Sequence, residues 1–412
     1  MIFANIRYKI VEEDIKAEMG GCIVGERGVK ALLERYGIPK FQNHVNYLFD
    51  VTEKMVRKEI DRIPDGIYPG ESYVFYDGIH EASKMKINLN VVVKGDKIIF
   101  DYSGSDSQTE GFVNAPLAAT SSAVLLTFLM LINPDIPHND GIIRPIKIVS
   151  PKGTFLNAEY PAATTFGNSI TGPNADAIMK AFSTILSKKV TAGWNRFLGF
   201  TLTGKDPRNK RSYVDILFLA LKGGSGGTYM ADGYDHIGLI NCAGGILAQD
   251  YEMFEIQDPH FLVKHEYLRD SAGAGQWRGG LGVETIFEIY GENVTGIAFG
   301  DGVEEEARAF GLFGGKEGSI NKVELLYPDG TIRIAKSKEI IRDIPKNTLF
   351  QNIAGGGGGY GDPFLRPVDR VLDDVKNELV STKRAKKDYG VVIDEVTMDV
   401  DQEATKSLRR RS

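Results

Sequence analysis

The sequence predicts a mixed α+β protein with more than one domain. Apolar residues recur with the period of a helix over the first 64 residues, and the period changes to two near residue 85. Residues 223–361 hold 28 of the 47 glycines, a density that disfavours long helices and favours short strands joined by many turns. A chain of 412 residues is also too long for one compact core, so two or three domains are expected.

Residues 1–64 are predicted to form two helices. In Glu26–Tyr36 apolar residues fall at i, i+3, i+4 and i+7, and Gly37 and Pro39 end that helix. The second helix ends at the turn that begins with Pro64, and one stripe of it carries Val45, Leu48, Phe49, Thr52, Met55, Val56, Ile60 and Ile63.

Four further elements are predicted before residue 205. Alternating apolar residues over 85–93 predict a strand, which a turn at Lys94–Lys97 joins to a second strand at Ile98–Tyr102. An apolar helix is expected near 116–132. After a polar loop at Thr164–Thr171, a helix is predicted that has Pro173 in its first turn and Ile178, Met179, Phe182, Ile185 and Leu186 on its inner face.

The glycine-rich part is expected to contain strands at Tyr213–Leu221, Val283–Ile289 and Asn321–Leu326. A helix is predicted after Pro367, with Val368, Val371, Leu372, Val375 and Leu379 as its apolar stripe. The expected division is therefore a helix-and-sheet part at 1–205, a glycine-rich, mainly β part at 206–366, and a C-terminal helix and tail at 367–412.

Composition excludes several classes of function. The net charge of −6 and the pI near 5.7 argue against a surface for nucleic acid or anionic membranes. Cys22 and Cys242 form neither a metal spacing nor a disulfide framework, which fits a reducing cytoplasm. The N-terminus lacks the features of a signal peptide, and the apolar run Leu117–Ile132 is shorter than a membrane span. A cytoplasmic protein without a membrane partner is expected.

One stretch, Asp270–Glu284, surrounds Trp277 and Arg278 with five glycines. Helix interiors avoid glycine, so a tight, irregular backbone is expected here. A cation held in this way can serve to bind a ligand, and the guanidinium fork of Arg278 matches a carboxylate or a phosphate. The alternative is a cluster of β-turns in which only glycine fits.

The glycine runs do not predict a nucleotide site. Gly355–Gly359 with Gly361 formally satisfies G-x-G-x-x-G, but Asp362-Pro363 prevents a helix from starting there and no βαβ unit surrounds the run. The Gly-Gly-Lys near residue 315 has the wrong spacing for a P-loop. Gly223–Gly227 could offer a row of backbone N–H groups to an anion, or could be a flexible connection.

The best polar cluster in the sequence is Asp232-Gly-Tyr-Asp235-His236, with Glu252 and Glu255 beyond it. Carboxylates beside a histidine could form an acid/base pair or a site for a hard metal ion. Asp235 and His236 can line one site only if the segment is a loop, because neighbouring strand residues point to opposite faces. The alternative is a hydrogen-bonded loop without chemistry. The candidate catalytic residues are Asp232, Asp235, His236, Glu252, Glu255 and Arg278.

These motifs, in their order along the chain, resemble the hydantoinase B/oxoprolinase family. The residues in several of the motifs are most similar to those of the alpha subunits of acetone carboxylases. The resemblance covers nearly the whole chain. The matching stretches are Asp101–Ser105, Asn114–Pro116, Pro134–Pro137, Ser150–Gly153, Gly167-Asn168, Asp232–Asp235, Glu252 with Glu255, Asp270–Gly280, Gly311–Gly315, Gly355–Pro363 and Asp388–Val392.

The resemblance implies a subunit of an ATP-dependent complex. A partner similar to hydantoinase A would bind ATP, and the complex would carboxylate a ketone or open a cyclic amide such as a hydantoin or 5-oxoproline. Members of the family usually begin with a further N-terminal region whose metal site, with manganese expected, is not recognisable in this chain. The resemblance therefore assigns no metal ligand here. It implies either that a separate polypeptide supplies the metal site, or that the chain is a split or shortened product without independent activity.

Three functions follow as expectations. The first is part of a ketone carboxylase that forms a 3-oxo acid, and the second is part of an ATP-dependent cyclic-amide hydrolase. The third is a subunit that serves assembly and takes no part in catalysis. Sequence patterns do not separate the first two, because they differ in substrate: a ketone and bicarbonate against a lactam and water.

Overall fold

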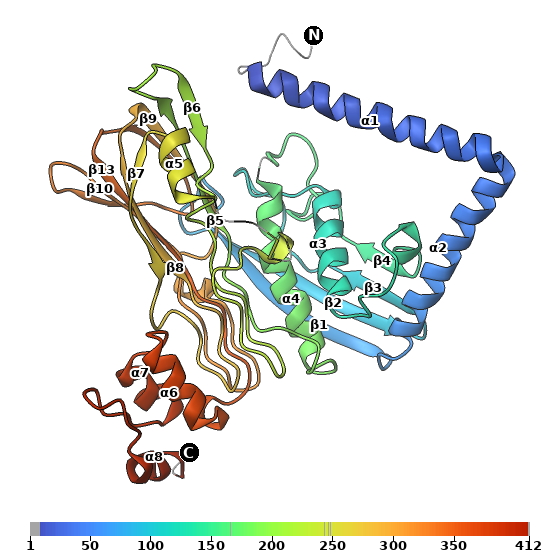
Figure 1. Cartoon of the computed structure of the whole chain (residues 1–412). Helices are drawn as coiled ribbons and strands as arrows, with labels where there is room; N and C mark the ends of the chain where they lie inside the picture. The colour runs from blue at the N-terminus through green and yellow to red at the C-terminus, as the bar shows by residue number, and fades with distance from the viewer. Residues whose placement is uncertain (1–8, 165, 243, 246, 248, 411–412) are drawn as a thin grey trace.

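The structure is a computed structural model that describes residues 9–164, 166–242, 244–245, 247 and 249–410. The described residues form eight α-helices and three mostly antiparallel sheets (Figure 1), which confirms the mixed α+β class. Three separate clusters of buried apolar side chains lie in the N-terminal part, between the two later sheets, and among the C-terminal helices.

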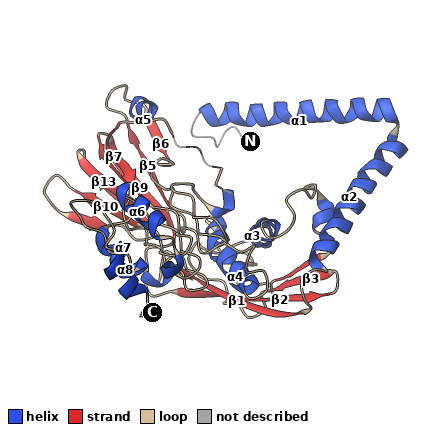
Figure 2. Cartoon of the chain, turned by 60° about the horizontal axis from the view of Figure 1, so that its bottom comes forward, coloured by secondary structure: helices blue, strands red, loops and turns tan. Residues whose placement is uncertain are grey.

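The first two helices form an arm. Helix α1 (Lys9–Tyr36) ends at Gly37, whose φ of 75° turns the chain into α2 (Ile38–Ile60). Both predicted helices are therefore confirmed, and the first is longer than the pattern from Glu26 indicated. Figures 1 and 2 show α2 extending away from the first sheet and α1 running back over the molecule from the outer end of α2.

The first sheet has the order β1-β2-β3-β4, in which β4 is parallel to β3. The alternating apolar residues of β2 are all buried, as their period of two predicted. Helices α3 and α4 lie together over this sheet, and α4 packs directly on β1 and β2 (Figure 1). The bounds are β1 (Gly66–Phe75), β2 (Lys84–Lys94), β3 (Lys97–Asp101), β4 (Ile146–Val149), α3 (Leu117–Leu129) and α4 (Thr171–Ser183).

The other two sheets share one core. Phe200 and Phe287 from different sheets both contact Phe350, with ring centroids 4.9 and 4.8 Å apart. The sheet orders are β12-β9-β5-β6 and β11-β10-β13-β8-β7. Their strands are β5 (Leu198–Lys205), β6 (Ser212–Asp215), β7 (His260–Tyr267), β8 (Val283–Ile289), β9 (Glu292–Gly300), β10 (Lys322–Leu326), β11 (Ile332–Ile334), β12 (Lys338–Ile344) and β13 (Thr348–Ala354).

One predicted strand is wrong. The strand expected over Tyr213–Leu221 stops at Asp215, whose carboxylate accepts the N–H of Leu217 at 2.8 Å. Leu217 then takes a φ of +38°, outside the β region, and the pairing with β5 does not continue past Asp215. Leu219, Ala220 and Leu221 are buried in an irregular segment, whereas Phe218 is exposed, so burial rather than β pairing explains the three buried residues.

The glycine-rich segments lie side by side as extended chains between the sheets and the C-terminal helices (Figure 1). Gly355–Gly359 runs through their middle. Successive N–H groups of this run donate to three different segments: Gly357 to Gly280 O at 2.9 Å, Gly358 to Gly193 O at 2.8 Å and Gly359 to Lys316 O at 2.8 Å. Because the bonds point in different directions, the layer is neither a flat sheet nor a set of tight turns.

Glycine is required here because neighbouring backbones approach too closely for a side chain. A Cβ on Gly357 would lie 1.8 Å from Ser225 O, and one on Gly280 would lie 1.9 Å from Tyr234 O. The N–H groups of Gly224 and Gly227 already donate to Gly355 O and Gly358 O. The interpretation of Gly223–Gly227 as a free row of donors for an anion is therefore wrong for those two groups, which bind the chain's own carbonyls.

The C-terminal part differs from the single helix that the sequence predicted. It consists of α6 (Val368–Lys376), α7 (Thr382–Tyr389) and α8 (Gln402–Arg409), which have a small core of their own. Glu378, with a φ of +60°, breaks the chain after α6, and Ser381 then caps α7. The proposed domain boundary at 205 falls on the last residue of β5, which pairs with β6 beyond it. The division into three parts stays a prediction.

Candidate functional site

A buried ionic cluster lies under the loop that carries Asp232, Asp235 and His236. The guanidinium of Arg366 binds Asp232 through two hydrogen bonds of 2.7 and 2.9 Å, and it also binds Asp374 at 2.9 Å. Arg278 donates to Asp235 at 2.9 Å and lies 3.4 Å from Asp374. Two cations therefore bind three carboxylates from segments distant in the sequence, which leaves one negative charge in excess.

This cluster fixes the conformation of the loop. Asp232 also accepts the backbone N–H of Arg278 at 2.8 Å, and Asp235 accepts that of Leu281 at 2.7 Å. Burial acts to raise the pKa of Asp232, but the hydrogen bonds and charge of Arg366 outweigh it and hold that pKa below its ordinary value. Asp232 is therefore ionised, and it holds the loop to both the glycine layer and the C-terminal part.

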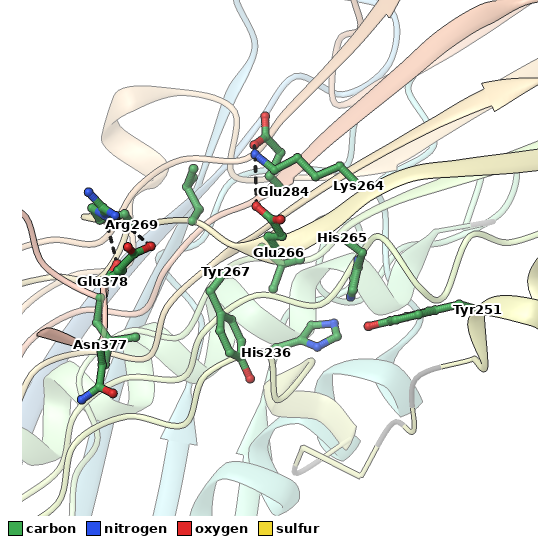
Figure 3. A pocket seen from close by; sticks show the side chains of 13 residues that line it. His236, Tyr251, Lys264, His265, Glu266, Tyr267, Arg269, Glu284, Asn377 and Glu378 are labelled. Atoms are coloured by element: carbon green, nitrogen blue, oxygen red, sulfur yellow. Dashed lines mark hydrogen bonds and ion pairs between the residues drawn. The ribbon is translucent and has the colours of Figure 1, made fainter.

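The cluster positions His236, which comes directly after Asp235. Its φ of +47° turns its side chain towards a cavity of about 730 Å³, where its ring lies 4.9 Å from that of His265 on β7 (Figure 3). Tyr251, the first residue of α5 (Tyr251–Gln257), contacts His265 with a ring separation of 5.5 Å. His265 Nδ1 hydrogen-bonds Thr285 Oγ1 at 2.8 Å, which fixes the orientation of that ring.

The remaining wall of the cavity is polar. Its charged groups are paired, with Lys264 Nζ 2.6 Å from Glu284 and Arg269 3.0 Å from Glu378 (Figure 3). Convergent polar groups of both signs suit a small polar ligand rather than an apolar one. The lining residues are His236, Tyr251, Lys264, His265, Glu266, Tyr267, Leu268, Arg269, Val283, Glu284, Asn377, Glu378 and Leu379.

Both histidines of the cavity are neutral near pH 7. Burial, together with the positive charge of Lys222, lowers the pKa of His236 to about 4, and the same two causes lower the pKa of His265 to about 4. Among the described residues, His236 Nε2 has no hydrogen-bond partner. In a neutral imidazole one nitrogen donates and the other accepts, and the hydrogen bond from the ring to the backbone of Leu219 leaves Nε2 as the acceptor.

We expect histidine NMR titrations to place both midpoints near pH 4, against about 6.5 in the unfolded chain. Between these values the unfolded state binds more protons, so the free energy of unfolding should fall as the pH drops from 6.5 towards 4. A His236→Gln/His265→Gln variant should lose less stability over that interval than the wild type. A midpoint near 6.5 for either ring in the folded protein would contradict the assignment.

The structure brings together four of the six candidate residues. Asp232, Asp235 and Arg278 form the ionic cluster, and His236 lies beside it in the cavity. The segment is a loop, which is the condition under which Asp235 and His236 can serve one site. The side chain of Arg278 is only 8% exposed and its guanidinium is held by carboxylates of the chain.

The other two candidates lie outside the cavity. Glu255 accepts the backbone N–H of Leu262 at 2.9 Å and so joins α5 to β7. Glu252 is exposed in the first turn of α5. Glu255 follows Tyr251 by four residues, on the same side of α5, but its carboxylate is taken up by the Leu262 N–H and does not line the cavity.

Sequence reasoning missed several residues of the site. His265 lies in no motif of the sequence, and its pairing with His236 follows from the position of β7 beside the loop. Arg366 and Asp374 gave no local signal, because 134 residues separate Arg366 from its partner Asp232. Tyr251 and Tyr267 belong to the same group, since neither lies in a recognisable motif.

The resemblance implied a divalent metal, which would need several suitable donors close together. Across residues 9–410, within the described ranges, no group of three or more His, Cys, Asp or Glu side chains could hold a metal ion. His236 and His265 lie close together, but no carboxylate completes a set with them. These residues do not fit a manganese site, and none of them is assigned a metal.

No helix in the described part of the chain combines the length and apolar character needed to cross a membrane. The apolar helix α3 is 13 residues long, which agrees with the prediction that its run is a core helix.

Comparison with known proteins gives relatives over nearly the whole chain. The beta subunit of the caprolactamase of Pseudomonas jessenii is 31% identical over 406 residues, which are 96% of this chain and 68% of the relative. The B subunit of a putative D-/L-hydantoinase of Pseudomonas sp. (strain NS671) is 30% identical over 98% of this chain and 69% of the relative. The chain thus spans about two thirds of the length of these relatives.

Two solved structures share the fold. The crystal structure of the ATP-dependent caprolactamase of Pseudomonas jessenii matches with a TM-score of 0.88 and 29% identity over 98% of this chain and 70% of that chain. A nucleotide-free acetone carboxylase matches with a TM-score of 0.87 over 99% of this chain and 60% of that chain, at 20% identity, which shows a common fold.

The model of the hydantoinase B/oxoprolinase family matches residues 1–363, which include the Asp232–His236 loop, Arg278 and most of the cavity lining; Arg366, Asp374 and the lining residues 377–379 lie beyond the match. The resemblance that the motifs indicated is thereby confirmed. This chain belongs to the hydantoinase B/oxoprolinase family.

Proposed function

We propose that the chain is a subunit of an ATP-dependent enzyme that hydrolyses a cyclic amide. The observation that carries this proposal is the similarity to the caprolactamase beta chain over 96% of this chain, supported by the hydantoinase relative. Both relatives are named for ring-opening of cyclic amides. Cyclic-amide hydrolysis is thus the first candidate function and ketone carboxylation the second, whereas the sequence motifs placed ketone carboxylation first.

The His236 cavity is the proposed ligand site. An amide offers an N–H donor and a C=O acceptor, and neutral imidazole rings can satisfy both. The two histidines have pKa values near 4, so they are weak bases at pH 7, and we assign them to binding and orientation. Asp232, Asp235 and Arg278 act as positioning residues because they fix the loop that carries His236.

ATP is proposed to bind to a partner subunit that resembles hydantoinase A. The caprolactamase structure is named as ATP-dependent, and the caprolactamase and hydantoinase relatives are named as subunits. In this chain the glycine runs support that division, since Gly224, Gly227 and Gly357–Gly359 donate their N–H groups to other segments of the protein. A phosphate would need such groups to be free. A metal-bearing segment remains a proposed second partner.

Ketone carboxylation is the second candidate. It is favoured by the shared fold with acetone carboxylase, which extends over 99% of this chain. The product would be a 3-oxo acid formed from a ketone and bicarbonate. The polar cavity suits a small ketone with bicarbonate as well as it suits an amide, so the two candidates are distinguished by their substrates.

The test is an assay of the native complex purified through this chain. We expect ATP-dependent ring-opening of caprolactam, hydantoin or 5-oxoproline, followed by chromatography of the amino-acid product. His236→Ala should lower kcat/KM by about 10- to 100-fold, the effect of one or two lost hydrogen bonds in a ligand site. His138→Ala is the control, because His138 is exposed and distant in the fold.

Two outcomes would overturn the proposal. ATP-dependent fixation of bicarbonate with acetone, without ring-opening, would establish the carboxylase. An assembled complex whose activity is the same with wild-type chain and with His236→Ala would indicate that this chain serves assembly.

A further inference from the structure

The cavity beside His236 has one wall that comes from the C-terminal helices. Residues 377–379 connect α6 to α7 and line the cavity, and Figure 3 shows Asn377 and Glu378 on the side of it away from Tyr251. These three residues, the C-terminal wall, lie beyond residue 363, where the match to the family model ends. The family model therefore includes the His236 side of the cavity and does not include this wall.

The C-terminal wall is held in place by its backbone. Leu379 O accepts the N–H of Asp270 at 3.1 Å, and Glu378 O accepts the Nε–H of Arg269 at 3.1 Å. Just beyond the wall, the N–H of Ser381 donates to the carboxylate of Asp270 at 2.8 Å. Because these bonds use main-chain atoms of the wall, the side chain of Leu379 can be replaced without releasing it.

Two of the three side chains of the wall already have partners within the protein. Asn377 Nδ2 donates to Asp373 O at 2.8 Å, and the carboxylate of Glu378 lies 3.0 Å from the guanidinium of Arg269. The third side chain, that of Leu379, is apolar and half-buried. A ligand that contacts Leu379 breaks no hydrogen bond or ion pair, and it gains affinity when hydrocarbon is buried there.

A cyclic amide has two unlike parts. Its amide group carries an N–H donor and a C=O acceptor, for which His236 and His265 are the proposed partners. The rest of the ring is hydrocarbon in a simple lactam, whereas it carries further polar amide groups in a hydantoin and a carboxylate in 5-oxoproline. Leu379 suits hydrocarbon, and the negative charge of Glu378 beside it disfavours a carboxylate on the ligand.

We propose that the C-terminal wall determines which cyclic amides the cavity accepts, and that Leu379 favours simple lactams over hydantoins and 5-oxoproline. The inference rests on the part of the proposed function that places a cyclic amide in the cavity. Leu379 is a specificity residue and takes no part in bond breaking. Burial of one methylene group changes an affinity about fourfold, so contact of one or two methylene groups with Leu379 gives a preference of about 4- to 15-fold.

Steady-state kinetics of the native complex test the wall. Leu379→Asn nearly keeps the size of the side chain and removes its apolar character. We expect it to raise the KM for caprolactam by about 4- to 15-fold with kcat nearly unchanged, because the lost contact is common to the ground state and the transition state. The KM for hydantoin should not rise.

Leu365→Asn is the matched control. Leu365 lies just before α6, is 62% exposed and is not part of the cavity lining, so this variant should keep the wild-type KM for both substrates. A complex that opens hydantoin or 5-oxoproline in preference to caprolactam would overturn the inference and leave the proposed function intact. The same holds if Leu379→Asn has the KM values of the wild type.

NMR of the histidine Cε1–H signals in the full chain measures binding without turnover. Caprolactam should shift the signals of His236 and His265, which the His236→Gln and His265→Gln variants identify, and Leu379→Asn should raise its Kd by the same factor as the KM. If no cyclic amide is opened but this titration behaves as expected, ring-opening is rejected and the role of the wall stands. If caprolactam shifts neither signal, or binds wild type and Leu379→Asn equally, the inference is wrong.

Discussion

Replacing Gly357 by alanine is expected to destabilise the protein by more than about 4 kcal/mol, enough to abolish stable folding in a marginally stable chain. The added Cβ would lie 1.8 Å from Ser225 O, 2.2 Å from Ser225 C and 2.8 Å from Gly226 N. These atoms belong to backbone that is itself hydrogen-bonded, so no side chain can rotate away to make room.

The same substitution would also disturb neighbouring segments. Gly357 donates to Gly280 O at 2.9 Å and accepts from Gly273 N at 2.8 Å. Displacing it would therefore weaken the stretch that carries Arg278. Urea unfolding followed by tryptophan fluorescence provides the measurement.

Gly172→Ala is the matched control for Gly357→Ala. Gly172 lies in α4, a Cβ there meets nothing within 4 Å, and alanine is the better helix former. We expect this control to raise stability slightly, by up to about 1 kcal/mol. If Gly357→Ala unfolded at the same urea concentration as Gly172→Ala, the close packing of the glycine layer would be disproved.

Arg196→Met is expected to cost about 3–5 kcal/mol, the loss typical of breaking a buried ion pair. Arg196 joins the N-terminal sheet to the later part of the chain. Its guanidinium donates to Asp301 at 2.9 Å, to Asp176 at 3.1 Å, and to β1 through Tyr73 O at 2.8 Å and Ser72 Oγ at 3.0 Å. Removing it leaves two buried carboxylates without their cation.

The cause can be separated from simple loss of volume. Methionine retains most of the packing of the arginine side chain. Adding Asp176→Asn to Arg196→Met removes one of the two unpaired carboxylate charges. The double variant should therefore be more stable than the sum of the two single losses predicts. Arg144→Ala removes an exposed arginine paired with Asp50, and this variant should unfold at the same urea concentration as the wild type. Additive losses would show that Asp176 and Arg196 do not interact.

The site shows how far local patterns reach. The cluster Asp232–His236 was predicted from residues within five positions of one another, and three of the candidate residues do meet in the ionic cluster while His236 lies beside it. Glu252 and Glu255 were added because they are near in sequence, and the structure directs them elsewhere. Nearness along the chain decides which residues share a loop, but the packing of α5 on β7 decides which of them face the cavity.

The sequence by itself determined the family and several elements: the amphipathic helices, the hairpin of β2 and β3, and strands β8 and β10. Periodicity and motif order can be recognised along the chain without knowing which segments pack together. Only the tertiary structure decided that five glycines at 355–359 form the centre of a layer, and that Arg366 reaches Asp232 across 134 residues. It also decided that the strand predicted over Tyr213–Leu221 stops at Asp215, since Leu219–Leu221 are buried without β pairing. The periodicity of apolar residues is a property of neighbouring positions along the chain. Which distant residue a side chain contacts is decided by the packing of all the elements together.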